Sequence, residues 1–324
     1  MKLTVGTFNL NNLFSRYNFQ AEIGAIPDAG TLPIAGAFAY AFGPGEPVKV
    51  RSYMGRLVKA KDDASTQAIA ERIQRINMDV LAVQEVEDID TLRQFNRERL
   101  GGMYPHVLLI EGNDPRLIDV GVLSRYPIGG FTSWQRATHP LAPDDLVFGR
   151  DVIEVEILNT QRSERLFTLF NTHLKSNYVD FHDDQAQAHA AANERRRRQA
   201  ETVARIIKAR TRPDSRYALL GDMNDAPTSE FLRGFTQDAE LKLVNGLTAP
   251  QETRPAKPDN PMPASTAWTH RFKPANQPAQ YELYDQVWLS PALAPKQTAA
   301  WIDRRTKHSG DGSDHDPAWV ELTL

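Results

Sequence analysis

Short polar segments follow several apolar runs of this 324-residue sequence, and their side chains are of the types that bind a metal ion and activate water. They carry Asn, Asp, Glu and His, and the chain contains no cysteine. Oxygen ligands favour a hard cation such as Mg²⁺ or Mn²⁺, and the shortage of soft ligands argues against a structural zinc site. The residues in question are Asn9, Asn11, Glu85, Asn171, His173, Asp222, Asn224, Asp285, Asp314 and His315.

A phosphate ester is the substrate that such a set of residues suits. Its transition state spreads negative charge over the non-bridging oxygens, where a divalent cation and imidazolium groups stabilise it. A carboxylate then orients or deprotonates the attacking water. These residue types therefore predict metal-assisted hydrolysis of a phosphate ester.

The elements that must position these residues are strands alternating with helices. Ser65 is a plausible helix N-cap before Ile69, Ile73 and Ile76. The stretch 151–158 alternates apolar and acidic residues, which predicts a half-exposed strand that pairs with the following one as a hairpin. Further helices are expected at 88–100 and 183–210, and strands at 1–8, 79–85, 106–110, 118–124, 166–171, 217–221, 284–289 and 317–322. This order predicts a layered α/β sandwich, in which ligands bind beyond the strand ends.

The composition is that of a globular protein, with 41% hydrophobic residues, 24% charged residues and a formal net charge of −3. A near-neutral balance argues against a uniformly basic coat, so contacts with a polyanion must come from local patches. The opening residues 1–8 read as a strand rather than a signal peptide, which makes a cytoplasmic address the default and leaves export open if a leader has been trimmed. The weakly polar run 31–42 is too short for stable membrane insertion, and no protein partner is inferable.

Six segments, in order, resemble the motifs of the endonuclease/exonuclease/phosphatase superfamily, which includes pancreatic-type deoxyribonucleases, exonuclease III-like repair enzymes, neutral sphingomyelinases and inositol polyphosphate 5-phosphatases. The resemblance implies a four-layered α/β sandwich of two packed, mostly antiparallel sheets flanked by helices. It also implies one domain over 1–324, with a long insertion at about 15–61 on the active-site side. The segments are Phe8-Asn9-Leu10-Asn11, Gln84-Glu85, Asn171-Thr172-His173-Leu174, Gly221-Asp222-Met223-Asn224, Tyr284-Asp285-Gln286-Val287 and Ser313-Asp314-His315-Asp316-Pro317.

The resemblance implies a role for each residue. Glu85 is expected to be the main ligand of Mg²⁺ or Mn²⁺, helped by Asn11 and Asp314, although the family often has Asp where Asn11 stands. The predicted catalytic residues are Asp222 for the attacking water, Asn224 and His315 for the phosphate, Asp285 to orient His315, and His173 as a second histidine.

Substrate contacts are predicted for four further residues, of which Asn9 also suits a hydrogen bond to a neighbouring site residue. For Arg116 a salt bridge in a turn is an equal alternative. The four residues are Asn171, Lys175, Arg116 and Asn9.

Two basic stretches suggest nucleic acid as the substrate. The insertion carries Phe38, Tyr40 and Phe42 followed by basic residues, and Arg304, Arg305, Lys307 and His308 form a second expected basic rim. The run 195–198 of four arginines fits a salt-bridged helix face better than a phosphate contact. We therefore expect a metal-dependent nuclease of DNA or RNA, with a phosphomonoesterase of small molecules and a sphingomyelinase-like lipid phosphodiesterase as alternatives.

Overall fold

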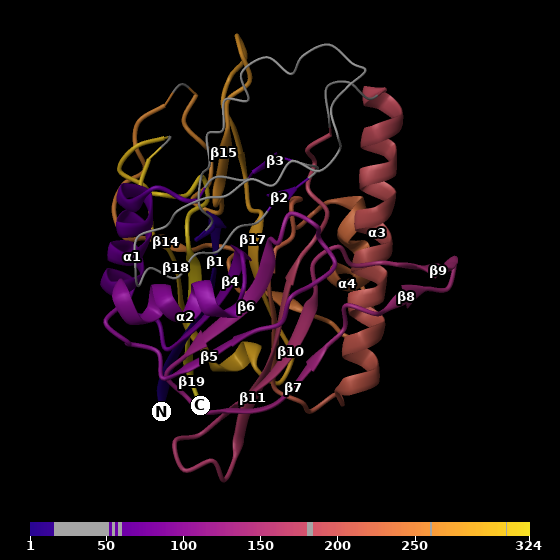
Figure 1. The fold of residues 1–324 in the computed structure, drawn as a ribbon. Helices are drawn as coiled ribbons and strands as arrows, with labels where there is room; N and C mark the ends of the chain where they lie inside the picture. The colour runs from indigo at the N-terminus through magenta and orange to yellow at the C-terminus, as the bar shows by residue number, and fades with distance from the viewer. Residues whose placement is uncertain (16–51, 54–55, 58–59, 180–183, 260, 309) are drawn as a thin grey trace, which may run out of the picture.

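The computed structural model describes residues 1–15, 52–53, 56–57, 60–179, 184–259, 261–308 and 310–324. Most of the expected insertion at 15–61, including Phe38, Tyr40 and Phe42, lies outside these residues. Within them, two large β-sheets face each other, with helices on the outer side of each (Figure 1).

The first sheet has seven strands and contains both ends of the described chain. Strand β1 lies at its centre, antiparallel to β19 and parallel to β4. In spatial order the strands are β14 (Gln251–Glu252), β18 (Gln297–Ile302), β19 (Ala318–Thr323), β1 (Lys2–Leu13), β4 (Val80–Val86), β6 (Asp119–Ser124) and β5 (His106–Leu109).

The second sheet has six strands, and β11 and β12 are its parallel pair. In spatial order they are β13 (Val244–Asn245), β17 (Asp285–Leu289), β12 (Tyr217–Asp222), β11 (Arg165–His173), β10 (Val152–Leu158) and β7 (Ile128–Ser133). Most neighbouring strands in both sheets are antiparallel, as predicted. Shorter two-stranded pairs are β2 (Ser52–Tyr53) with β3 (Arg56–Leu57), β8 (Thr138–His139) with β9 (Ala142–Leu146), and β15 (His270–Phe272) with β16 (Gln280–Glu282).

Helices complete the four layers of the sandwich. Helices α1 (Asp63–Ile76) and α2 (Ile89–Glu98) pack on the outer face of the seven-stranded sheet, and α3 (Gln185–Arg210) and α4 (Arg233–Thr236) on that of the six-stranded sheet (Figure 1). Single 3₁₀ turns form at η1 (Glu230–Leu232) and η2 (Ala294–Lys296). Apolar side chains from the inner faces of both sheets fill the space between them. The predicted four-layered α/β sandwich is confirmed.

Two local predictions need correction, and one strand was not predicted. Helix α1 begins three residues early, because Asp62 is its N-cap and accepts a hydrogen bond from the backbone of Ser65. Strand β10 is buried rather than half-exposed, since Glu154 is covered by Arg210 and Trp134, which both donate to its carboxylate. Strand β18 went unpredicted.

No helix in the described ranges combines the length and apolar character that a membrane span requires.

The two sheets bring the predicted polar residues to one edge of the sandwich. Strands β1 and β4 run in parallel, with Asn9 opposite Gln84, so both leave the sheet at the same side. In the other sheet β11 and β12 are parallel, and His173 lies opposite Asp222, which in turn faces Asp285 of β17. Residues distant in sequence therefore meet at one strand-end surface.

Candidate active site

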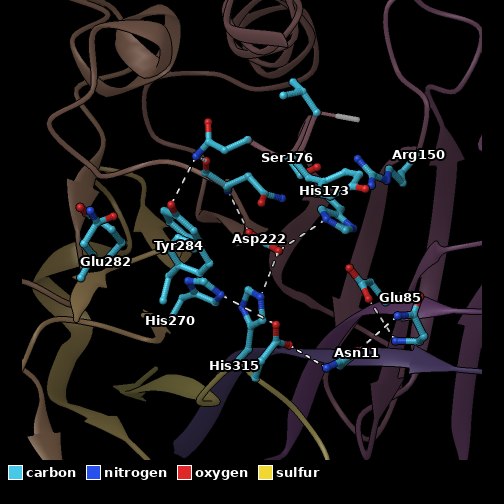
Figure 2. A pocket seen from close by; sticks show the side chains of 18 of the residues that line it. Asn11, Glu85, Arg150, His173, Ser176, Asp222, His270, Glu282, Tyr284 and His315 are labelled. Carbon is cyan, nitrogen blue, oxygen red and sulfur yellow. Dashed lines mark hydrogen bonds and ion pairs between the residues drawn. The ribbon is translucent and has the colours of Figure 1, made fainter. Parts of the chain in front are cut away.

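A cleft of about 970 Å³ opens at this strand-end surface. Figure 2 shows Asp222 near its centre, with Tyr284 and His270 on one side and His173 and Arg150 on the other. The predicted site residues that line it are Asn11, Glu85, Arg116, His173, Asp222, Asn224, Asp314 and His315.

Four residues of the cleft have left-handed backbone conformations. Asn11, Asn12, Glu85 and Asn224 have φ values of 46°, 58°, 59° and 52°. Asparagine tolerates this region, whereas glutamate rarely adopts it, so Glu85 stores backbone strain of the kind found at functional sites. The pairing of β1 with β4 shifts register between Asn9 and Leu13, beside Glu85. This irregularity ends the regular ladder where both strands reach the cleft.

Asp222 is the buried centre of the site. Its Oδ2 accepts a hydrogen bond from Asn9 Nδ2 at 2.9 Å, and its Oδ1 accepts one from the backbone of Asn224 at 2.9 Å. The ring nitrogens Nε2 of His173 and His315 lie 3.5 and 3.8 Å from Asp222 Oδ2. Burial raises the pKa of Asp222 to about 6, against the opposing effect of the positive charge on His315. The carboxylate is thus fixed in place, and its pKa is raised toward neutral pH.

His315 is paired with a second buried carboxylate. Its Nδ1 lies 2.6 Å from Asp285 Oδ2, the contact that the predicted orienting role requires. Burial alone would lower the pKa of His315, but Asp285 and Asp222 raise it well above its ordinary value. His315 therefore carries a positive charge at neutral pH and directs Nε2 toward Asp222.

His173 has the opposite electrostatic environment. Burial, together with the nearby charges of Arg150 and His315, lowers its pKa well below the ordinary value. Its Nδ1 has no hydrogen-bond partner among the described residues. The site accordingly combines one imidazolium with one neutral imidazole on either side of the same carboxylate.

The predicted metal ligands lie together at the edge of the cleft nearest β1. Asn11 Nδ2 donates to Asp314 Oδ1 at 2.8 Å, and Glu85 Oε2 accepts from the backbone of Asn12 at 3.0 Å. Burial lowers the pKa of Lys61, while Glu85 and Asp314 oppose this shift, so a cation at this edge meets two carboxylates. An all-oxygen donor set that attracts positive charge fits a hard divalent cation.

Tight groups of three acidic or histidine side chains involve other residues as well. Among the described residues, Asp222, Asp285 and His315 form one such group, with ligand atoms within 4.8 Å of one another. His270, Asp314 and His315 form another. Despite desolvation, which would raise it, the pKa of Asp314 is held below its ordinary value by a hydrogen bond from His270 and by the charge on His315. Asp314 therefore stays ionised.

Three of the predicted substrate contacts require correction. Asn171 is fully buried between the sheets, where its amide accepts from Gln84 and donates to two backbone carbonyls, so it does not reach the cleft. Lys175 directs its ammonium group to the backbone carbonyls of Ser176 and Tyr178 rather than into the cleft. Asn9 donates a hydrogen bond to Asp222, which is the alternative role predicted for it. Only Arg116 of the four lines the cleft, and it also pairs with Asp114.

The two arginines of the expected second basic rim are buried, whereas Lys307 is exposed and His308 is partly exposed. Arg304 is fully buried over the face of Trp268, 3.7 Å from the ring centre, and Arg305 is 5% exposed. Both pair with the buried Asp316. In the run 195–198, Arg196 is buried and Arg197 and Arg198 pair with Glu194 on α3, which bears out the salt-bridged reading for those two.

The structure adds three side chains to the site that the sequence did not single out. Arg150 lines the cleft although it is 4% exposed, and its guanidinium donates to the carbonyl of Leu174. The ring of His270 stacks on Tyr284, with centroids 5.0 Å apart at 15°, and lies 5.0 Å from the ring of His315. No strand-end pattern marks Arg150 or His270, whereas Tyr284 opens the motif segment Tyr284-Asp285-Gln286-Val287 but received no predicted role.

The sequence profile of the Endonuclease/Exonuclease/phosphatase family matches residues 6–315. No curated protein matches the chain. Among solved structures, an endonuclease/exonuclease/phosphatase from Bacteroides vulgatus is 15% identical with a TM-score of 0.58, covering 100% of this chain and 99% of that one. TDP2 from D. rerio, complexed with single-strand DNA product, is 12% identical with a TM-score of 0.56 and the same coverage. A mannosyl-6-phosphatase from Bacteroides thetaiotaomicron is 15% identical with a TM-score of 0.54, covering 99% of this chain and 100% of that one.

Proposed function

Because the chain belongs to the endonuclease/exonuclease/phosphatase family, whose members are divalent-metal-dependent phosphoester hydrolases, we propose that it is a nuclease cleaving DNA or RNA phosphodiester bonds with Mg²⁺ or Mn²⁺. The observation that carries the proposal is the pair of arginines, Arg116 and Arg150, that lines the cleft beside His173. A phosphodiester within a polynucleotide has further phosphates on both sides, and guanidinium groups bind phosphate well.

The residues around Asp222 account for the attack on phosphorus. Asp222 takes a proton from the attacking water, for which its pKa of about 6 is well matched at neutral pH. The new P–O bond forms as the bond to the leaving oxygen breaks on the opposite side, and the leaving oxygen takes a proton from solvent. The imidazolium of His315, held by Asp285, binds a non-bridging oxygen and stabilises the charge that develops there. Neutral His173 and Asn224 supply further hydrogen bonds to the phosphate.

Glu85, Asn11 and Asp314 would hold the divalent cation. When bound, the cation neutralises phosphate charge and polarises the P–O bond. Asn11 contributes an amide oxygen without charge, so the negative charge of the metal site comes from Glu85 and Asp314.

A phosphomonoesterase of small molecules is the second candidate, favoured by the fold shared with the B. thetaiotaomicron mannosyl-6-phosphatase. A small phosphorylated molecule needs neither an extended cleft nor two arginines beyond the reacting phosphate. The cleft volume of about 970 Å³ also suits a small-molecule ligand, so it is the pair of arginines that favours the polymeric substrate.

Purified protein assayed with Mg²⁺ or Mn²⁺ on four substrates separates the candidates. The substrates are plasmid DNA, single-stranded DNA and RNA oligonucleotides, sugar and inositol phosphates, and sphingomyelin vesicles. We expect cleavage of nucleic acid that chelator abolishes, and Arg150→Met should lower kcat/KM on oligonucleotides far more than on p-nitrophenyl phosphate. Intact nucleic acid beside hydrolysed phosphate monoesters would reject the nuclease.

A further inference from the structure

One wall of the cleft is the small hairpin β15–β16, which projects from the strand-end surface (Figure 1). Its cross-strand pairs are His270 with Glu282 and Phe272 with Gln280. All four side chains line the cleft, because residues two apart on a strand share a face. The hairpin therefore offers an aromatic ring, an amide, a carboxylate and an imidazole to whatever lies beside the reacting phosphate.

The opposite face of the hairpin is anchored to the protein. Arg271 and Tyr281 both bond to the carboxylate of Asp259, at 2.5 and 2.7 Å. Tyr281 also packs edge-on against Trp268, with ring centroids 4.9 Å apart. At the base, the backbone N–H of Thr269 donates to the carbonyl of Glu282. The cleft-facing side chains are thus presented by a fixed backbone, which limits the entropy lost on binding.

Exposure and position distinguish these side chains from ordinary surface residues. Phe272 is 56% exposed although it is a large apolar ring, and it lies about 7 Å further out than His270 along the strand. His270 itself contacts the ring of His315. An aromatic ring at this distance from the phosphate-binding histidine is placed for the base of the same nucleotide.

Charge decides which part of a nucleotide this wall accepts. Glu282 is half-buried and lines the cleft, so its carboxylate makes this side unfavourable for a second phosphate. The side with Arg116 and Arg150 is favourable for one. Figure 2 places Glu282 and Arg150 on opposite sides of Asp222. The polynucleotide backbone then follows the arginines, and the base next to the scissile phosphate faces the hairpin.

On the basis of the proposed nuclease activity, we propose that the hairpin β15–β16 is a nucleobase-recognition wall that selects guanine beside the scissile phosphate. Phe272 stacks on the base. The two oxygens of Glu282 accept from the adjacent N1–H and N2–H groups, which guanine alone among the common bases presents side by side. The amide of Gln280 donates to O6. Gln280 and Glu282 both line the cleft, and neither side chain is tied by a hydrogen bond to another described residue.

Single-stranded oligonucleotides that differ only at the base beside the cleaved bond test the stacking contact. Phe272→Ala should lower kcat/KM by about 10- to 100-fold, the range measured for loss of one base-stacking ring. An abasic residue should produce a similar loss in the wild type and little further loss in Phe272→Ala. Phe131→Ala is the matched control, because Phe131 is 55% exposed on β7 and does not line the cleft.

Replacing guanine with inosine removes the 2-amino group and tests Glu282. The wild type should discriminate between the two bases by about tenfold, and Glu282→Gln should abolish this preference while circular dichroism stays unchanged. Equal rates for Phe272→Ala and Phe131→Ala on a cleaved oligonucleotide would overturn the recognition wall and leave the nuclease standing. A Phe272→Ala loss confined to sphingomyelin vesicles would overturn it in favour of lipid docking. Absence of any oligonucleotide cleavage would instead reject the proposed function itself.

Discussion

The pH dependence of Asp222 gives the most direct test of the proposed mechanism. Burial raises the pKa of this carboxyl to about 6, whereas an exposed aspartate titrates near 4. Only the ionised form accepts a proton from water, so activity should rise with pH through this value. About 9% of the carboxyl is ionised at pH 5 and about 91% at pH 7. We therefore expect kcat/KM at pH 5 to be about tenfold lower than at pH 7.

A substrate whose leaving group needs no proton isolates this step, and thymidine 5′-(p-nitrophenyl phosphate) with saturating Mg²⁺ is suitable. Circular dichroism at each pH is the control for folding. Asp222→Asn should lower kcat by about 10²- to 10⁴-fold at every pH and lose the rise near pH 6. In this variant an NH₂ group replaces the oxygen of residue 222 that accepts the hydrogen bond from Asn9 Nδ2. Two donors then face each other, which costs about 1–3 kcal/mol of stability. The chain should nevertheless fold.

Three results would refute the reasoning. A wild-type profile that is flat between pH 5 and pH 7 would show that Asp222 does not titrate near 6 or does not act as the base. An Asp222→Asn variant with wild-type turnover would show that another group activates the water. A profile that rises only above pH 8 would point to a metal-linked ionisation instead.

Three further predictions concern other carboxylates. Asp285→Asn should lower the pKa of His315, seen by NMR titration of the imidazole, and reduce kcat by at least about 100-fold, because the amide keeps an acceptor but removes the charge that holds the imidazolium. Glu85→Gln should weaken Mg²⁺ binding at least about tenfold in isothermal titration calorimetry, and unchanged affinity would remove Glu85 from the metal site. Burial raises the pKa of Asp119 to about 7, so ionisation destabilises the folded state as pH rises from about 4 to 7. Asp119→Asn should therefore be about 1–3 kcal/mol more stable than wild type at pH 8, with the gain lost below pH 4, as measured by urea unfolding.

The strand ends could be predicted from the sequence because each places a polar residue directly after an apolar run. The run Leu219-Leu220-Gly221 ending at Asp222 is an example, and the parallel pairing of β11 and β12 then fixes His173 opposite it. Such a local pattern predicts both the strand and the site residue at its end. The same alternation of strands and helices predicted a layered α/β sandwich, and the resemblance to the endonuclease/exonuclease/phosphatase superfamily implied its four layers.

Residues whose role depends on long-range packing could not be predicted in this way. Arg150 follows Gly149 in an ordinary turn sequence, and only the packing of the cleft shows that it is buried beside His173. Asn171 ends an apolar run just as Asp222 does, yet its partner Gln84 lies on the other sheet. The sequence pattern alone does not show whether the side chain at the end of a strand points into the cleft or toward the opposite sheet.

The arginines before the final motif show how the same long-range packing serves the active site. Asp316, directly after His315, binds Arg72 at 3.0 Å, Arg305 at 3.0 Å and Arg304 at 3.3 Å. Arg72 also donates to the backbone carbonyl of His315. A loop held by three buried guanidinium groups has little freedom, so the imidazole keeps its 2.6 Å contact with Asp285 without help from substrate. Arg304 and Arg305, which the sequence suggested for a nucleic-acid surface, are instead buried and hold the loop that carries His315.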